Sequence, residues 1–156
     1  MFSLLKPFIF KIDPEMAHDL AIKSLKYNFL PAEVFKVEHE EILETKIFKT
    51  KIKNPIGLAA GFDKSAEVYN SLFRFGFGFI EVGTVTPKKQ FGNPKPRIFR
   101  LENDRALINR LGFNNDGLEK ISKRLYKNSP NGFLGINIGP NKDSENRVDD
   151  YLKCLK

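Results

Sequence analysis

The spacing of hydrophobic and polar residues differs between the N-terminal part of the chain and the part that follows about residue 45. In the N-terminal part the spacing is helical. Asp13 followed by Pro14 is typical of a helix start, because the carboxylate can cap the first turn and proline fits the first helical position. A second short helix is predicted from Pro31 to about Val37. The face of the first helix carries small and apolar residues: Ala17, Leu20, Ala21, Ser24 and Leu25.

Strand-like patterns begin at about residue 45. Residues 46–53 alternate lysine with Phe, Thr and Ile, which predicts a half-exposed strand, or a small hairpin if the chain turns within the segment. Three later apolar runs, at residues 56–60, 79–86 and 133–139, each end in a loop of glycine or polar residues and predict buried strands. Two further short strands are expected within residues 97–112.

Helices are expected between and after these strands, at residues 65–75, 117–127 and 144–156, with Ser65 and Asn115 as caps of the first two. Alternation of strand and helix implies a parallel sheet with right-handed crossovers. Both an open doubly wound sheet and a (β/α)8 barrel have this alternation. A barrel needs eight strand–helix units over roughly 250 residues, whereas the pattern predicts three of them.

Composition and charge narrow the class of protein. The 156 residues are 41% apolar and 29% charged, which is typical of a globular chain with a core. The net charge of +7 is uneven: residues 1–50 carry 7 Lys and Arg against 8 Asp and Glu, and the remainder carries 19 against 11. A basic surface can bind nucleic acid, lipid or an anionic small molecule. No zinc knuckle, RNP-like motif or arginine-rich arm is present, so we expect no nucleic-acid partner and no metal site.

Cysteine usage and hydropathy add two expectations. Cys154 is the single cysteine, which excludes an intrachain disulfide and favours a reducing compartment, and its helical spacing indicates a core-facing thiol rather than a nucleophile. No apolar run reaches the roughly 20 residues that span a membrane. The apolar residues 1–10 either lie in a lipid interface or pack on their own domain.

Small and polar residues gather where the three buried strands end. These ends are Ala60-Gly61 with Asp63-Lys64, Gly83-Thr84, and Asn137 with Gly139. Parallel α/β folds bind their ligands at this edge, so the three ends predict one shared pocket. The loop 57-GLAAGFDK-64 fits neither the Walker spacing nor G-x-G-x-x-G, which leaves a strand end small enough for a flat ligand, followed by a cation.

Four long motifs resemble one family. In this order and spacing, NPIGLAAGFDK, FGFIEVGTVTPKKQFGNPKPRIFR, ALINRLGFNNDG and GINIGPNKD are similar to dihydroorotate dehydrogenases, and DPEMAH before the first barrel strand resembles the class 2, quinone-dependent, membrane-associated type. The resemblance implies a (β/α)8 barrel with bound FMN that oxidises dihydroorotate to orotate in pyrimidine biosynthesis. It divides the chain into an N-terminal helical quinone-access segment, residues 1–44, and the first part of the barrel, residues 45–156.

The same resemblance assigns site residues. It implies quinone-access positions at His18 and Arg100, and a Lys64 that reaches both flavin and substrate, where its charge suits the reduced flavin and the anionic substrate. The amide of Asn109 suits the paired donors and acceptors of the orotate ring. The flavin-binding residues implied are Ala60, Gly61, Phe62, Asp63, Lys64, Thr84 and Asn137. The substrate-binding residues implied are Lys64, Asn109, Arg110, Leu111, Gly112 and Phe113.

Some features of the family have no match in this sequence. The family's general base is a serine on a later loop, and neither that serine, nor the second asparagine motif, nor the phosphate-binding loops are found. We therefore expect an inactive fragment of a peripheral protein on the cytoplasmic face of a bacterial inner membrane. Two alternatives stay open: a non-catalytic α/β module that binds anions or lipid, and a class 1 enzyme with another electron acceptor.

Overall fold

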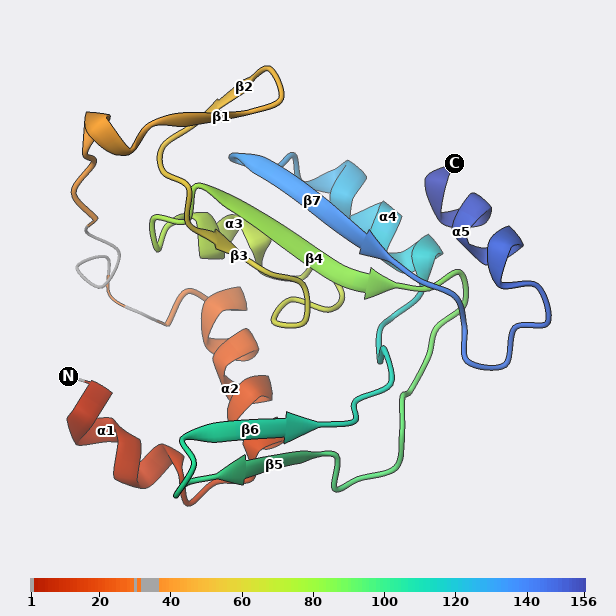
Figure 1. The fold of residues 1–156 in the computed structure, drawn as a ribbon, viewed down its shortest axis with the longest axis horizontal. Coiled ribbons are helices and arrows are strands. Elements are labelled where there is room, and N and C mark those ends of the chain that lie inside the picture. The colour runs from red at the N-terminus through yellow and green to blue at the C-terminus, as the bar shows by residue number, and fades with distance from the viewer. Residues whose placement is uncertain (1, 30, 32–36) are drawn as a thin grey trace.

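A three-stranded parallel sheet lies at the centre of the computed structural model, which describes residues 2–29, 31 and 37–156 (Figure 1). Its strand order is β3-β4-β7, with β3 at Gly57–Leu58, β4 at Phe79–Val85 and β7 at Phe133–Ile138. Gly57 pairs with Phe79, and Phe79 pairs in turn with Phe133. The three predicted strands are confirmed, with the first reduced to two residues. Buried residues occur in β4, whereas β3 and β7 are partly exposed, so the prediction that all three are buried is wrong for these two.

Each of these strands is followed by a helix, as the alternation predicted. The helices are α3 at Tyr69–Phe73, α4 at Leu118–Lys127 and α5 at Arg147–Leu155. On β4, Ile80 and Val82 are fully buried and pack with residues of α3 and α4 in the core. Since side chains alternate along a strand, the other side of β4 carries Glu81. The helices therefore cover the side of the sheet that carries Ile80 and Val82.

Two antiparallel hairpins accompany the sheet. The first joins β1 (Thr45–Ile47) to β2 (Thr50–Ile52), so the hairpin alternative for residues 46–53 is the correct one. The second joins β5 (Ile98–Leu101) to β6 (Ala106–Asn109), as predicted for residues 97–112. Figure 1 shows the second hairpin beside α2, away from the central sheet. It forms a second wall opposite the strand ends.

The N-terminal segment contains α1 at Phe2–Ile9, α2 at Pro14–Lys26 and a short 3-10 helix, η2, at Glu41–Leu43. The predicted cap is confirmed: Oδ1 of Asp13 accepts the amide hydrogens of Glu15 and Met16 at 3.0 and 2.9 Å. Most of the helix predicted from Pro31 to Val37 lies outside the described residues. Among the helices that the structure describes, none combines the length and apolarity needed to cross a bilayer.

Two predicted helix caps are wrong. The helix expected from Ser65 begins at Tyr69, because the carboxylate of Asp63, and not the Ser65 hydroxyl, accepts the amide hydrogens of Glu67 and Val68 at 2.8 Å each. The next helix takes Gly117 as its N-cap. The expected cap, Asn115, instead accepts the Gly117 amide hydrogen and ties this turn to Thr86.

The last helix begins at Arg147 rather than at Ser144. Asn146 caps it by accepting the amide hydrogen of Asp149 at 3.1 Å. Cys154 lies on this helix, half-buried, with its Sγ 3.9 Å from the carbonyl oxygen of Val85 on β4. Burial raises the pKa of this thiol, which fits the predicted core-facing cysteine.

Candidate functional site

The three strand ends meet through backbone and side-chain hydrogen bonds. The amide of Gly61 donates to the carbonyl of Gly83 at 2.9 Å, and the Gly83 amide donates to the carbonyl of Asp63 at 3.1 Å. The Thr84 hydroxyl donates to Oδ1 of Asn137 at 2.6 Å. The loops after β3 and β4 and the end of β7 therefore form one continuous rim, as the sequence predicted.

Gly83 is a position where only glycine fits. Its φ is +110°, a conformation that L side chains rarely adopt. A Cβ there would lie 2.4 Å from the carbonyl oxygen of Asn137. This close approach brings β4 and β7 together at the rim. The Asn137 amide also donates to Oε1 of Glu81 at 2.9 Å, so its orientation is fixed from two sides.

A cavity of about 600 Å³ opens between this rim, the β5–β6 hairpin and α2. Its volume lies within the range of small-molecule and cofactor sites. Polar groups come from Lys64, Thr84 and Asn109, and apolar surface comes from Ile98 and Leu107. Its lining includes most of the residues that the resemblance assigned: His18, Ala60, Gly61, Phe62, Lys64, Thr84, Arg100, Asn109, Leu111, Gly112 and Phe113.

Lys64 stands beside His18 at the wall of this cavity. Its Nζ lies 3.3 Å from Nε2 of His18, and the imidazole ring packs edge-on against Phe62 with 5.1 Å between ring centroids. Burial lowers the pKa of Lys64, and burial together with the Lys64 charge lowers the pKa of His18. A neutral His18 can accept a hydrogen bond from the Lys64 ammonium, so the pair presents one positive charge toward the cavity.

The stretch 109–113 approaches the cavity from the second wall. Asn109 ends β6, and Leu111, Gly112 and Phe113 follow it along the lining. Arg110 differs from its neighbours: it does not line the cavity, and its guanidinium donates to the carbonyl of Pro96 at 3.1 Å. Asn109 therefore lines the cavity, whereas the side chain of Arg110 binds backbone outside it.

Two other assigned residues stay behind the lining. The side chain of Asp63 is buried and binds the amides of Glu67 and Val68. Burial raises its pKa against the effect of these hydrogen bonds. Asn137 does not line the cavity. Its side-chain oxygen accepts the hydroxyl hydrogen of Thr84, which does. Asp63 thus shapes the loop of Lys64, and Asn137 orients a hydroxyl that lines the cavity.

Arg100 joins the hairpin to the N-terminal segment. Its Nη1 donates to the carbonyl oxygens of Phe10 and Ile12 at 3.1 and 2.7 Å, and its guanidinium lies over the Phe10 ring at 4.8 Å. These carbonyls follow α1, where helical oxygens lack partners. Arg100 therefore fixes the connection between α1 and α2 while it lines the cavity.

Sequence reasoning missed an ion pair behind the cavity, between Glu15 on α2 and Arg97 just before β5. Its distance is 2.5 Å from Nη2 to Oε1, and a second bond joins Nε to Oε2 at 3.1 Å. Both residues lie inside motifs that were recognised, DPEMAH and RIFR. Their partnership spans 82 positions of sequence, so no local signal could reveal it.

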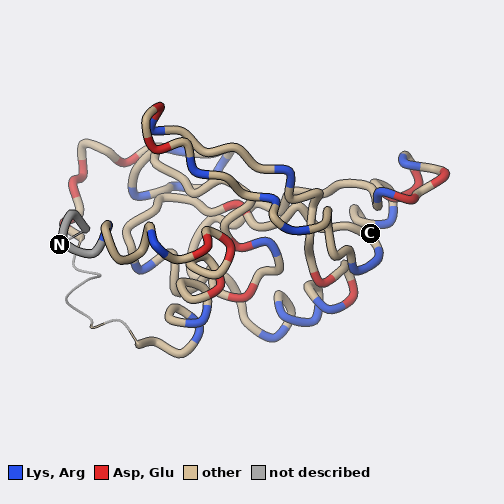
Figure 2. Tube along the Cα trace, turned by 90° about the horizontal axis from the view of Figure 1, so that it is seen from below, with Lys and Arg blue, Asp and Glu red and all other residues tan. Residues whose placement is uncertain are grey.

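The basic charge does not gather into a single face. Figure 2 shows basic and acidic positions interspersed along the trace. On α4 and α5, lysines pair with carboxylates one turn away, as in Lys123 with Glu119 and Lys153 with Asp149. Such pairs are typical of a solvated helix surface. The cationic groups that line the cavity are Lys64 and Arg100.

Comparisons with known proteins match the whole length of the chain. A family model described as Dihydroorotate dehydrogenase matches residues 42–156. Two relatives named dihydroorotate dehydrogenase (quinone), from Agrobacterium fabrum and Rhodopseudomonas palustris, are 52% and 50% identical to this chain. The alignments cover 95% and 99% of this chain but 40% and 42% of the relatives. The chain thus spans less than half the length of these relatives.

Solved structures agree with this match. The ligand-free dihydroorotate dehydrogenase of Eimeria tenella is 45% identical, with a TM-score of 0.84 over 92% of this chain and 42% of the other. The complex of that enzyme with ferulenol gives 46% identity and a TM-score of 0.81 over 89% and 39%. The three β/α units are therefore part of a (β/α)8 barrel, and the open doubly wound alternative is wrong. By its family model, its relatives and its fold, the chain belongs to the dihydroorotate dehydrogenase family.

Proposed function

We propose that this chain forms the N-terminal quinone-access segment, residues 1–44, and the first flavin- and substrate-facing part of a class 2 dihydroorotate dehydrogenase, residues 45–156. The full-length enzyme oxidises dihydroorotate to orotate and passes the electrons through FMN to a membrane quinone. One observation carries the proposal: residues assigned to flavin, to substrate and to quinone access line the same cavity of about 600 Å³. The relatives' names, which include the word quinone, support the choice of acceptor.

The residues present fit a flavin. A flat ring needs a wall without bulky side chains, and Ala60 and Gly61 supply one, since a Cβ on Gly61 would meet nothing within 4 Å. A flavin ring also has one polar and one apolar edge. The lining of the cavity contains both kinds of group: polar side chains such as Lys64 and Thr84, and apolar side chains such as Ile98. When bound, FMN supplies a two-electron acceptor for the hydride of the substrate.

The substrate assignment follows from charge and hydrogen-bonding capacity. Dihydroorotate carries a carboxylate and a ring rich in amide groups. Lys64 brings a positive charge that is partly removed from water, which strengthens its attraction to an anion. Asn109 brings both a donor and an acceptor. We assign Leu111, Gly112 and Phe113 to the surface that excludes water from the substrate, and we assign no general base to any residue of this chain.

The N-terminal helices suit a role at the membrane surface. Phe8 on α1 and Met16 and Leu20 on α2 expose 69%, 57% and 51% of their surfaces. Apolar groups on short surface helices bind the lipid interface without spanning it. His18 and Arg100 connect these helices to the cavity. We therefore propose peripheral binding at the cytoplasmic face of a bacterial inner membrane, with quinone entering between α1, α2 and the cavity.

The experiment uses the full-length protein that carries this chain. We expect a yellow protein whose flavin is released as FMN and which reduces a ubiquinone or menaquinone analogue with dihydroorotate as donor. Lys64→Ala should lower kcat/KM for dihydroorotate by about 100-fold or more, the scale of a lost charged contact of about 3 kcal/mol. The matched control is Lys123→Ala on the exposed surface of α4.

Three outcomes would overturn the proposal. Colourless protein that binds anionic vesicles would favour a non-catalytic module. Electron transfer to fumarate or a nicotinamide cofactor, but not to quinone, would favour a class 1 enzyme. Equal kcat/KM in Lys64→Ala and Lys123→Ala would remove Lys64 from the substrate site.

A further inference from the structure

The Glu15–Arg97 ion pair is nearly enclosed by protein. The two side chains expose 12% and 7% of their surfaces. Arg97 holds both carboxylate oxygens of Glu15, and Lys95 approaches the same carboxylate at 3.4 Å. The hydrogen bond from Arg97 is the main reason that the pKa of Glu15 lies below its usual range. A bidentate pair of this kind has a defined geometry and so fixes α2 against the start of β5.

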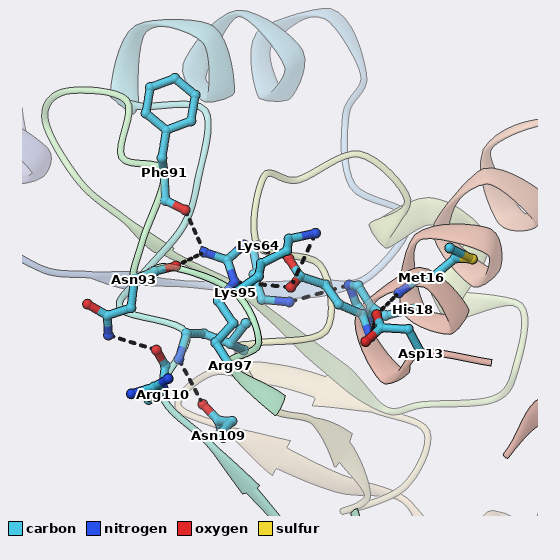
Figure 3. A network of polar contacts seen from close by, with 12 residues as sticks. Asp13, Met16, His18, Lys64, Phe91, Asn93, Lys95, Arg97, Asn109 and Arg110 are labelled. Carbon is cyan, nitrogen blue, oxygen red and sulfur yellow. Dashed lines mark hydrogen bonds and ion pairs between the residues drawn. The ribbon is translucent and has the colours of Figure 1, made fainter. Parts of the chain in front are cut away.

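Arg97 also holds the turn that precedes it. Its Nη1 donates to the carbonyl oxygens of Phe91 and Asn93 at 2.7 and 2.9 Å (Figure 3). With both ends of its guanidinium engaged, Arg97 links α2 to residues 91–93. This turn packs closely on the stretch that follows β6, because a Cβ on Gly92 would lie 2.2 Å from the carbonyl oxygen of Leu111.

Residues 90–93 in turn hold the backbone of the cavity wall. Asn93 donates from its amide to the carbonyl of Leu111 at 3.0 Å and from its side chain to the carbonyl of Arg110 at 2.7 Å. The side chain of Gln90 donates to the carbonyl of Gly112 at 2.9 Å. Three consecutive carbonyls of the substrate-facing stretch are therefore fixed from behind by one turn.

We propose that Glu15 and Arg97 are positioning residues that hold the stretch 109–113 over the cavity from the N-terminal helix. Neither residue lines the cavity. They act through Asn93, and Glu15 also acts through its charge, which raises the pKa of Lys64, so Asn93→Ala is the variant that isolates the hydrogen bonds. The inference rests on the proposed function for its kinetic consequence. Its structural part, the dependence of the 110–112 backbone on the ion pair, stands on the hydrogen bonds alone. It also makes the membrane-facing helix and the substrate site mechanically dependent on each other.

The test is made in the full-length protein with Glu15→Gln, and with Asn93→Ala as a second variant at the far end of the network. Both should raise KM for dihydroorotate by roughly tenfold with a smaller change in kcat, which corresponds to about 1.4 kcal/mol of lost positioning. Amide hydrogen exchange at residue 93 and at Arg110 should become faster in both variants, because these two amides donate to the carbonyls of Leu111 and Arg97. Glu119→Gln, which removes an exposed ion pair on α4, is the control and should change neither quantity.

Separate outcomes decide the inference and the function on which it rests. Unchanged exchange at residue 93 and at Arg110 in a folded Asn93→Ala or Glu15→Gln protein would overturn the positioning role. A change in KM for quinone alone would also overturn it, since α2 would then act only on quinone access. If wild-type protein lacks dihydroorotate oxidation, the proposed function fails, whereas faster exchange in the variants still supports the network.

Discussion

At the scale of residues, Lys64 is partly buried and is also hydrogen-bonded through its side-chain nitrogen. It is partly removed from solvent, which lowers its pKa, yet it has a neutral imidazole as hydrogen-bond partner at 3.3 Å. A hydrogen bond to the charged form favours that form. The carboxylates of Glu15, Asp19 and Asp63 oppose the effect of burial on the pKa of Lys64. The imidazole of His18 adds a hydrogen-bond acceptor for the ammonium.

This pairing predicts a pH effect. His18→Phe keeps a ring beside Phe62 but removes the acceptor from the Lys64 ammonium. The pKa of Lys64 should fall further below its usual range. On the proposed function, activity requires the protonated lysine and is lost as pH rises through that pKa, so the alkaline limb of kcat/KM for dihydroorotate should move to lower pH. The pH profile of flavin reduction in the full-length protein measures this shift.

The second histidine supplies the control. His39 lies at the surface and pairs with Glu44, away from the cavity. His39→Phe should leave the alkaline limb where it is in the wild type. An identical limb in His18→Phe would show that the imidazole does not support the charge of Lys64.

The sequence identified the residues that line the cavity more readily than the residues that hold them in place. Ala60 and Lys64 lie in a long motif at the end of a parallel strand, and strand ends of a parallel sheet converge by topology. Asn109 ends a strand of the separate β5–β6 hairpin, and only its motif indicated it. Asp63 lies in the same motif as Lys64, but its carboxylate binds the amides of the following turn. The difference depends on where a side chain points once the loop closes, which residue order does not specify.

At the scale of elements, a short turn replaces the expected first helical turns after β3. Ala66 takes a positive φ of 52°, which interrupts a helix, and Asp63 satisfies the two amides that a continuous helix would have used internally. The apolar spacing of Val68 and Leu72 was read correctly as core-facing, since both are buried. Periodicity thus predicted the buried face, while tertiary contacts decided where the helix begins.

Close packing at the junction of β3 and β4 predicts that one added methyl group, at Gly78, lowers the stability of the protein strongly. A Cβ on Gly78 would lie 1.9 Å from the carbonyl oxygen of Asn54, and the Gly78 amide donates to Ile56 at 2.9 Å. Because backbone and not a flexible side chain is in the way, Gly78→Ala should reduce the free energy of unfolding by about 3 kcal/mol. Urea denaturation of the full-length protein measures the loss.

Gly135 on β7 is the matched control for this change. A Cβ there would meet Glu81 at 3.5 Å, an ordinary contact. Gly135→Ala should therefore leave the unfolding midpoint nearly unchanged. Equal midpoints for the two alanine variants would mean that the β3–β4 junction relaxes freely, contrary to the packing described.

At the scale of the whole molecule, alternation of strands and helices predicted the parallel sheet. It could not decide between an open sheet and a closed barrel, because both begin with the same units and closure depends on strands that these three do not include. Likeness to solved relatives settled that choice. The ion pair between Glu15 and Arg97 belongs to the same scale, since it joins the N-terminal helix to the barrel.

The most direct test of the central claim is a crystal structure of the full-length protein with FMN and orotate. We predict that the flavin ring lies against Ala60 and Gly61, and that orotate lies within hydrogen-bonding distance of Lys64 Nζ and the Asn109 side chain, inside the cavity of about 600 Å³. Flavin or orotate bound elsewhere, with this cavity filled by other parts of the chain, would contradict the account.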